Sequence, residues 1–319
     1  WEITKWVLDF SKRRSVATHS AGIDPPGGLD EQRRIVQGAG HYETGCVQCH
    51  GSPLLLQPTI PQAMTPTPPQ LQDRIDRWEA AELFYITKHG IKFTGMPAFP
   101  SQQRNDEVWS VVAFLQKLPE LDEAGYSDLV YGDELATPTD AGEAESSDLD
   151  ARPVPGDVVQ SCFRCHGRDG TGRNGAFPVL AGQKEQYLKN SLTAYANQNR
   201  HSGMMAPIAA ALDEDGISAA AEYFSQLRNT SPPASVAEAR ITAGRRIAEA
   251  GVTKQRVGVC NSCHGPGAIS NTNYPVLAGQ PVEYLQTQLR LFQQRRRGGS
   301  EHAHLMHAAV DGLTEEQIQ

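Results

Sequence analysis

Several features that are common in other proteins are scarce or missing in this chain of 319 residues. No apolar run approaches the length of about 18 residues that a membrane-spanning helix requires, so no segment is expected to cross a bilayer. No basic helix or aromatic platform is present, and nucleic acid is therefore not an expected partner. Basic residues are absent from residues 120–150, which carry eleven acidic ones. The formal charge of -8 thus belongs to one stretch, and the remainder is near neutral.

Cysteine is also scarce, and its six residues fall in one repeated pattern, Cys-x-x-Cys-His. Two thiols three residues apart lie on one side of a helical turn, where both can form thioethers with the vinyl groups of one porphyrin. The adjacent histidine then lies under the iron as its proximal ligand. The sequence therefore predicts three covalently bound haem c groups. The attaching cysteines are Cys46, Cys49, Cys162, Cys165, Cys260 and Cys263, and the iron ligands are His50, His166 and His264.

Two other uses of a cysteine pair fit this chain less well. A structural zinc ion needs four ligands, usually from two pairs at set spacing, whereas these pairs stand about a hundred residues apart. Cysteines three apart rarely reach good disulfide geometry outside redox motifs, and a redox motif has no need of the histidine. The pattern favours haem over zinc or disulfide bonds.

The first haem motif is expected to lie in a domain of residues 30–120. Gly38 and Tyr42 precede the motif by eight and four residues, a spacing that suits a helix which another helix approaches closely while the aromatic ring packs beside the haem. A closing helix is predicted from its N-cap Asn105 to Pro119. A haem loop between two crossing helices is the plan of small class I cytochromes c. This resemblance implies an all-α fold of three such domains in tandem, each wrapped around one covalent haem.

Residues 121–155 are predicted to form an acidic linker, because they lack helical periodicity and are too poor in apolar residues to make a core. We interpret this linker as a spacer that like charges keep extended. A docking strip for a basic partner is the alternative.

The second domain (156–232) and the third (233–319) form an internal repeat. The closing helix of the third domain is expected to be incomplete, since the sequence stops one turn into it. The residues that recur unchanged 97 positions on include Pro178, Leu180, Gly182, Gln183, Tyr187, Leu188 and Leu192, which reappear as Pro275, Leu277, Gly279, Gln280, Tyr284, Leu285 and Leu289.

A methionine is expected as the sixth ligand of each iron. Met96 lies in a Gly- and Pro-punctuated loop just before the first closing helix, with Met64 and His89 as rivals. Met205 and Met306 each precede, by seven residues, a leucine that opens a capped helix, and these equal offsets favour Met205 over Met204. The first of these helices is expected to be capped at Asp213 and the second by a capping box of Thr314 and Gln317. Three histidines surround Met306 and leave two alternatives open, a surface metal site or displacement of the methionine. They are His302, His304 and His307.

A proline carbonyl is expected to accept the second ring N–H of each proximal histidine, as it does in class I cytochromes, and so to fix the ring. Pro178 stands twelve residues after His166 and Pro275 eleven after His264. Pro61 stands eleven after His50, in a stretch rich in prolines where the match is weaker.

Residues 1–29 are predicted to contain an N-terminal helix with Ile3, Trp6, Val7 and Phe10 on one face. That face would either adjoin a membrane anchor upstream of residue 1 or pack on the protein. Covalent haem attachment takes place outside an energy-transducing membrane, so we expect a periplasmic protein. The chain has no signal peptide and opens on Trp1, which suggests a processed product.

Residues 156–319 carry the motif Cys-x-x-Cys-His-Gly, the motif Pro-x-Leu-Ala-Gly-Gln-x-x-x-Tyr-Leu, and a methionine late in each repeat. They resemble the dihaem periplasmic cytochromes of the "c-four" type, and the resemblance implies two facing His/Met haem domains. Residues 30–120 resemble the single-haem class I domains that are attached to oxidases and dehydrogenases.

These patterns together predict a three-haem electron-transfer protein that is not itself an enzyme. We expect it to pass electrons from a quinol-oxidising complex or dehydrogenase to a terminal oxidase. The alternatives are the cytochrome subunit of a membrane-bound alcohol or sugar dehydrogenase, a haem peroxidase, and a gas or redox sensor. The last two need an open or labile iron site, which a candidate methionine for every haem disfavours.

Overall fold

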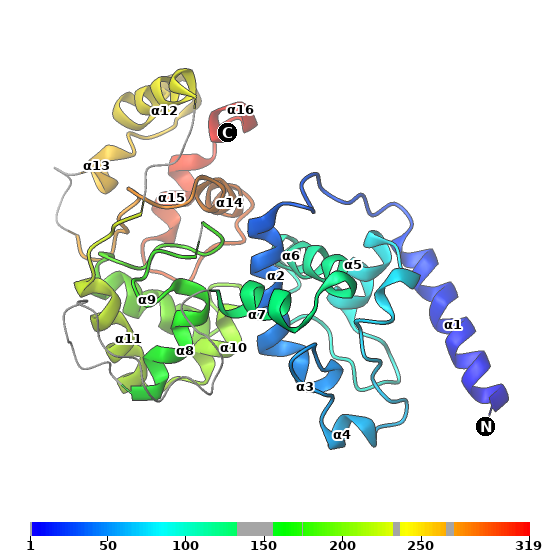
Figure 1. Cartoon of the computed structure of the whole chain (residues 1–319). Coiled ribbons are helices and arrows are strands. Elements are labelled where there is room, and N and C mark those ends of the chain that lie inside the picture. The colour runs from blue at the N-terminus through cyan, green and yellow to red at the C-terminus, as the bar shows by residue number, and fades with distance from the viewer. Residues whose placement is uncertain (1, 133–155, 174, 232–236, 266–270) are drawn as a thin grey trace. The chain divides into compact units, whose positions relative to one another are not determined.

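The computed structural model describes residues 2–132, 156–173, 175–231, 237–265 and 271–319 (Figure 1). Within those residues every regular element is a helix, apart from one isolated bridge between Val252 and Val257. The chain divides into two compact units, residues 1–145 and 146–319, and each is described by itself. The expected all-α fold is confirmed.

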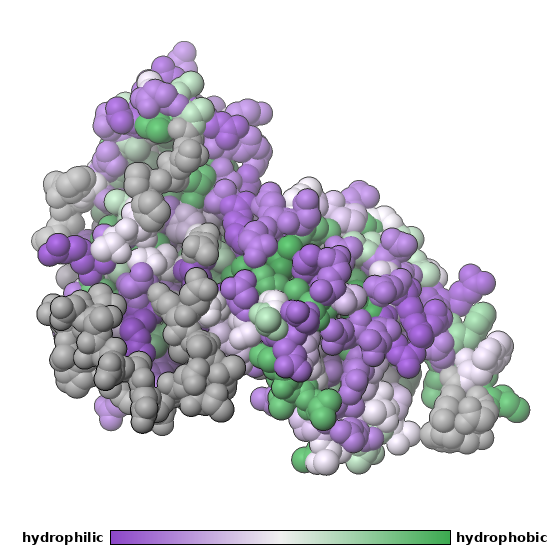
Figure 2. All heavy atoms as spheres, viewed as in Figure 1, coloured by the Kyte–Doolittle hydropathy of each residue, from purple (hydrophilic) through white to green (hydrophobic). Residues whose placement is uncertain are grey.

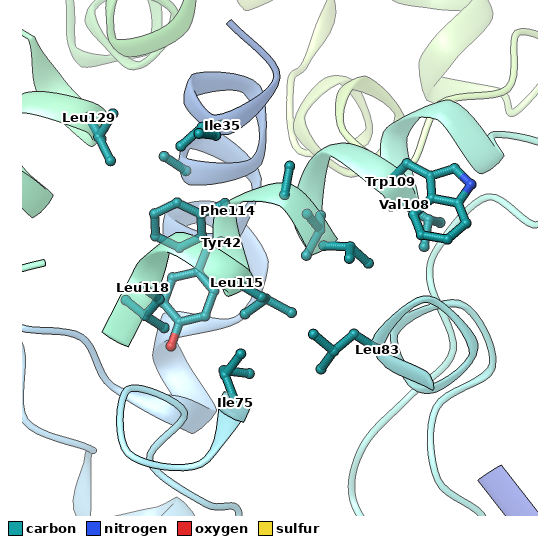
Figure 3. Close-up of a cluster of buried hydrophobic side chains, with 14 of the residues drawn as sticks. Ile35, Tyr42, Ile75, Leu83, Val108, Trp109, Phe114, Leu115, Leu118 and Leu129 are labelled. Atoms are coloured by element: carbon teal, nitrogen blue, oxygen red, sulfur yellow. The ribbon is translucent and has the colours of Figure 1, made fainter. Parts of the chain in front are cut away.

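The first unit is built around the crossing of α2 and α6. A β-carbon at Gly38 would lie 1.9 Å from the carbonyl oxygen of Ser110, so only glycine allows the two helices to come this close. Buried side chains fill the space around the crossing (Figure 3). The elements are α1 (Glu2–Ser20), α2 (Gln32–Gly45), α3 (Val47–His50), α4 (Thr59–Gln62), η1 (Ile75–Arg77), α5 (Ala80–His89), α6 (Asn105–Lys117), η2 (Leu118–Glu120) and α7 (Glu123–Tyr131).

Helix α7 corrects the prediction that the linker begins at residue 121. The Asp122 carboxylate accepts the Gly125 N–H at 2.8 Å and caps the helix. Tyr126 is fully buried, and its hydroxyl donates to Glu43 of α2 at 2.6 Å. The first domain therefore extends through residue 131. The sequence signal for α7 was local: a capping aspartate followed by apolar residues at helical spacing. The acidic composition of the stretch concealed this signal. Predicted linker residues 133–155 lie outside the described part of the chain.

Helix α1 differs along its length. Its last turns pack on the domain: Val16 is buried, and the ring of His19 stacks on Tyr85 of α5 with centroids 5.2 Å apart. The predicted apolar face near its start is exposed instead, with Trp6 at 67% and Phe10 at 49%. The face therefore does not pack on the first unit. Among the described helices, none combines the length and apolar character needed to cross a membrane.

The second unit contains the two repeats. In the first repeat α8, α9 and α11 enclose a core that includes Phe163 and Phe224. Asp213 caps α11 by accepting the Gly216 N–H at 2.8 Å, as its sequence predicts. The elements are α8 (Gly156–His166), α9 (Glu185–Ala196), α10 (Met205–Ala210) and α11 (Glu214–Gln226), then α12 (Glu238–Ala250), η3 (Thr253–Gln255), α13 (Asn261–His264), α14 (Val282–Gln293), α15 (Ala303–Val310) and α16 (Glu315–Ile318).

Fewer of the described side chains are buried in the second repeat than in the first. In the first repeat the thirteen-residue helix α11 buries Phe224, and the given sequence ends within the counterpart of this helix, α16. Helix α12 has no buried residue among those described, and Ile241 is 37% exposed. The expected capping box of Thr314 and Gln317 is present. The core of the second unit therefore lies mainly in the first repeat.

Candidate haem-binding sites

All three Cys-x-x-Cys-His motifs form one helical turn. In α3 and α13 the first cysteine is the N-cap, and its carbonyl accepts the histidine N–H at 2.9 Å in both cases. The second motif forms the last turn of α8. This geometry sets two thiols and an imidazole on neighbouring positions of one turn, as covalent haem attachment requires. All six cysteines are free of disulfide bonds.

A proline carbonyl accepts the Nδ1–H of each proximal histidine. The distances are 3.0 Å from His166 to Pro178 and 2.9 Å from His264 to Pro275, which confirms both predicted pairs. The bond fixes the ring and its tautomer, and leaves Nε2 as the atom that can bind iron. Burial lowers the pKa of His50, His166 and His264 by more than the carbonyl bonds raise it, so the neutral, metal-binding form is favoured.

The acceptor in the first domain is Pro69 and not Pro61, so that prediction was wrong. The distance from His50 Nδ1 to the Pro69 oxygen is 2.7 Å. Pro61 lies inside α4, a helical turn that lengthens this loop and moves the accepting carbonyl eight residues further along the chain. Gln57 holds the loop closed by donating to the carbonyls of Cys49 at 2.6 Å and Pro68 at 2.8 Å. Spacing alone could not choose among so many prolines.

Apolar surface borders the first site. Exposed apolar side chains gather over α3 and α4 (Figure 2), where Leu56 is 82% and Ile60 79% exposed. A hollow of about 180 Å³ beside His50 is lined by Tyr42, Leu55 and Leu71 among others. The expected place of Tyr42 near the haem motif fits this lining, and its hydroxyl donates to the Gly51 carbonyl at 2.7 Å. Free thiols, a fixed imidazole and apolar surroundings suit a porphyrin.

The candidate sixth ligands of the first haem lie close to one another. Met96 is half-buried in the loop between α5 and α6, and its N–H donates to the Thr94 hydroxyl at 3.1 Å. The methyl group of Met64 lies so near Gly95 that a β-carbon there would be 2.1 Å away. Met64 thus remains a rival. His89 is exposed and packs against Tyr85, as a surface residue would.

In the second unit, Met205 is the first residue of α10 and Met306 lies within α15. Both side chains are half-buried, and both assignments remain predictions. The three histidines around Met306 bond to separate partners, His302 to Asn273, His304 to Glu301 and His307 to Arg297. Within the described residues no group of three or more His, Cys, Asp or Glu could hold a metal ion. The surface metal site is therefore not supported.

Residues 33–115 match the family described as cytochrome C oxidase, cbb3-type, subunit III, and residues 157–228 match the family described as cytochrome c. Helical domains with three Cys-x-x-Cys-His turns and carbonyl-held histidines, taken with these matches, define a c-type cytochrome with three covalently bound haem c groups. The chain is an electron-transfer protein of that class.

Known proteins with similar sequences identify the family of this chain more closely. The chain is 35% identical over 162 residues to the thiosulfate dehydrogenase electron acceptor of Thiomonas intermedia (strain K12), a match that covers 50% of this chain and 74% of that protein. It is 32% identical over 188 residues to cytochrome c-552 of Acidithiobacillus ferridurans, covering 56% and 79%. It is 29% identical over 176 residues to cytochrome c4 of Stutzerimonas stutzeri, covering 50% and 81%. The chain belongs to the cytochrome c family that these proteins represent, and the expected "c-four" resemblance is confirmed.

Proposed function

We propose that this protein carries electrons in the periplasm, from a quinol-oxidising complex or dehydrogenase to a terminal oxidase, through three haems with His/Met ligation. One observation supports this proposal above others. All three domains hold the proximal histidine by the same proline-carbonyl bond, at 2.7, 3.0 and 2.9 Å, and each has a half-buried methionine later in its sequence. When bound, haem iron supplies one-electron redox chemistry, and the chain fixes the ligand and the surroundings.

The proposed sixth ligands are Met96, Met205 and Met306. A thioether ligand favours the reduced iron relative to a second imidazole, so fairly high reduction potentials are expected, in the range that delivery to an oxidase requires. Three occupied sixth positions also leave no open iron for peroxidase chemistry or gas sensing. We therefore propose that the protein is an electron carrier and not a catalyst.

Carbon monoxide tests the ligation. The reduced protein should bind none, whereas Met96→Leu, Met205→Leu and Met306→Leu should each bind one equivalent. The matched controls Met64→Leu and Met204→Leu should remain closed. Prompt binding by the unmodified protein would refute simple electron transfer at that haem, and binding only after loss of Met64 would reassign the first ligand.

A second candidate function is supported by one of the relatives, which is described as the electron acceptor of thiosulfate dehydrogenase. This chain would then take electrons directly from a dehydrogenase for an inorganic sulfur compound. An alcohol or sugar dehydrogenase, as the sequence suggested, has no comparable support among these relatives. Membrane anchoring through residues upstream of Trp1 remains part of the proposal, and the exposed Ile3 and Trp6 are consistent with it.

Co-purification from mildly solubilised native membranes distinguishes the partners. Oxidase haem that travels with the tagged protein, together with oxygen uptake, is expected. Reduction of the haems by thiosulfate with a co-purifying dehydrogenase, and no oxidase, would establish the second candidate instead.

A further inference from the structure

Two buried glutamines connect the repeats of the second unit. Gln183 donates to the Val276 carbonyl at 2.6 Å and accepts the Val276 N–H at 3.0 Å. Gln280, which stands 97 residues later, donates to the Val179 carbonyl at 2.7 Å and accepts the Val179 N–H at 3.1 Å. The exposed fractions of the two glutamines are 5% and 9%. The glutamine of each repeat therefore hydrogen-bonds to both the N–H and the carbonyl of one valine in the other repeat.

The backbone residue held in this way is next to the haem site. Val179 follows Pro178, whose carbonyl accepts the His166 Nδ1–H at 3.0 Å. Val276 follows Pro275, whose carbonyl accepts the His264 Nδ1–H at 2.9 Å. The Pro178 carbonyl and the Val179 N–H belong to one planar peptide unit, as do those of the other pair. The glutamine of one repeat thus binds the opposite side of the peptide that holds the histidine of the other.

A planar peptide transmits both position and polarity. Fixing its N–H fixes the direction of its carbonyl, and hydrogen bonds in a chain strengthen one another inside a low-dielectric interior. A stronger carbonyl acceptor makes the proximal imidazole a more basic ligand. A more basic ligand favours ferric iron and lowers the reduction potential of its haem.

We propose that Gln183 and Gln280 are positioning residues, each of which tunes the haem of the opposite repeat by anchoring the peptide that holds its proximal histidine. Gln280 acts on His166, and Gln183 acts on His264. The two haems are therefore adjusted as a pair, and only while the repeats are docked. The proposal rests on the electron-transfer function but not on any particular donor or acceptor.

The test is the set of three reduction potentials in the full-length, haem-loaded protein, titrated with chemical mediators. Gln280→Leu should raise the potential of the haem at His166, with a reduction equilibrium about threefold more favourable, which is about 30 mV because tenfold corresponds to 59 mV for one electron. The haem at His264 should shift less. Gln183→Leu should give the mirror result, and the haem at His50 should not change in either variant.

Assignment and controls use residues beside the haems. Nuclear Overhauser contacts from the shifted haem signals to Phe177 or Tyr274, which neighbour His166 and His264, identify each haem. Asn190→Ala removes another bond between the repeats, the 2.8 Å contact to Asn273, without touching a proline peptide. This variant should therefore not shift the potential of one haem selectively in the way that the glutamine variants do.

Equal shifts of both haems, or a shift only in the repeat that carries the mutation, would overturn the proposal and reduce the glutamines to general interface contacts. Unchanged potentials in both variants would do the same. Failure of the proposed ligation would appear in carbon monoxide binding and not in this crossed pattern, so the two outcomes are distinguishable. If either variant fails to fold, the other still gives the one-sided prediction.

Discussion

Replacing Gly38 with alanine tests the helix crossing on which the first unit depends. The new methyl group would lie 1.9 Å from the Ser110 carbonyl oxygen and 2.6 Å from Cβ of Phe114. Neither atom is the end of a flexible side chain, so α2 and α6 must separate. Overpacking a core costs about 1–3 kcal/mol, and overlap with backbone belongs at the upper end. Alanine regains about 1 kcal/mol of helix propensity. We therefore expect a net loss of about 2 kcal/mol.

The assay can be confined to this unit, because all four tryptophans of the chain lie in it, at positions 1, 6, 78 and 109. Guanidinium unfolding followed by tryptophan fluorescence reports the unit alone, through a lower midpoint at unchanged slope. Gly45→Ala is the matched control: it lies in the same helix and nothing lies within 4 Å of its added methyl group. It should leave stability unchanged or raise it by up to about 1 kcal/mol. Equal midpoints for the two variants would refute the close crossing.

Two further substitutions test the first unit. Tyr126→Phe removes the 2.6 Å bond to Glu43, so amide exchange in α7 should accelerate about 30-fold, for a loss of about 2 kcal/mol; unchanged exchange would contradict docking of α7. Burial, with Arg104 adding to it, lowers the pKa of His41 to about 3, whereas the unfolded chain takes up this proton near pH 6.5. Stability should therefore fall by up to about 1.4 kcal/mol per pH unit as pH drops from about 6.5 to 3. The guanidinium midpoint of His41→Phe should lose this part of its pH dependence, and an identical profile would contradict it.

The haem sites were predictable wherever the chemistry is local. A cysteine pair and its histidine fit on one turn. Short loops of twelve and eleven residues then return the chain to the histidine, so that the Pro178 carbonyl meets His166 and the Pro275 carbonyl meets His264. The first domain breaks this rule because α4 is inserted in its loop, so the accepting carbonyl belongs to Pro69. Local spacing predicts a contact only where the loop contains no extra helical turn.

The fold was predictable to the same extent. Gly38 indicated the close crossing of two helices, and the caps at Asp213 and Thr314 indicated where helices begin. Helix α7 was missed, because acidic composition outweighed a capping aspartate and the apolar spacing after it. The sequence showed Gln183 and Gln280 only as residues that recur at the same position of both repeats, and gave no sign of their contacts. Their partners stand 93 and 101 residues away, and sequence spacing alone cannot predict contacts at that range.

Several contacts between the two repeats are polar, and this has a physical consequence. Arg200, which is buried, stacks on Tyr195 at 4.5 Å and donates to the Tyr284 hydroxyl of the other repeat at 3.4 Å. Arg297, 97 residues later, stacks on Phe292 at 4.5 Å and donates to the Tyr187 hydroxyl at 3.0 Å.

A docking that missed these partners would remove one hydrogen bond from each guanidinium, and a bond to a charged group contributes about 1.5–3 kcal/mol. Arg200 would keep its 3.1 Å bond to Ser191 of its own repeat. An apolar interface would tolerate sliding, because the hydrophobic effect has no direction. Reciprocal polar contacts therefore select one arrangement of the repeats. The glutamine pair requires that arrangement, since each amide must meet both polar groups of a single residue. Polar side chains thus set both the docking of the repeats and the position of the two peptides whose carbonyls hold His166 and His264.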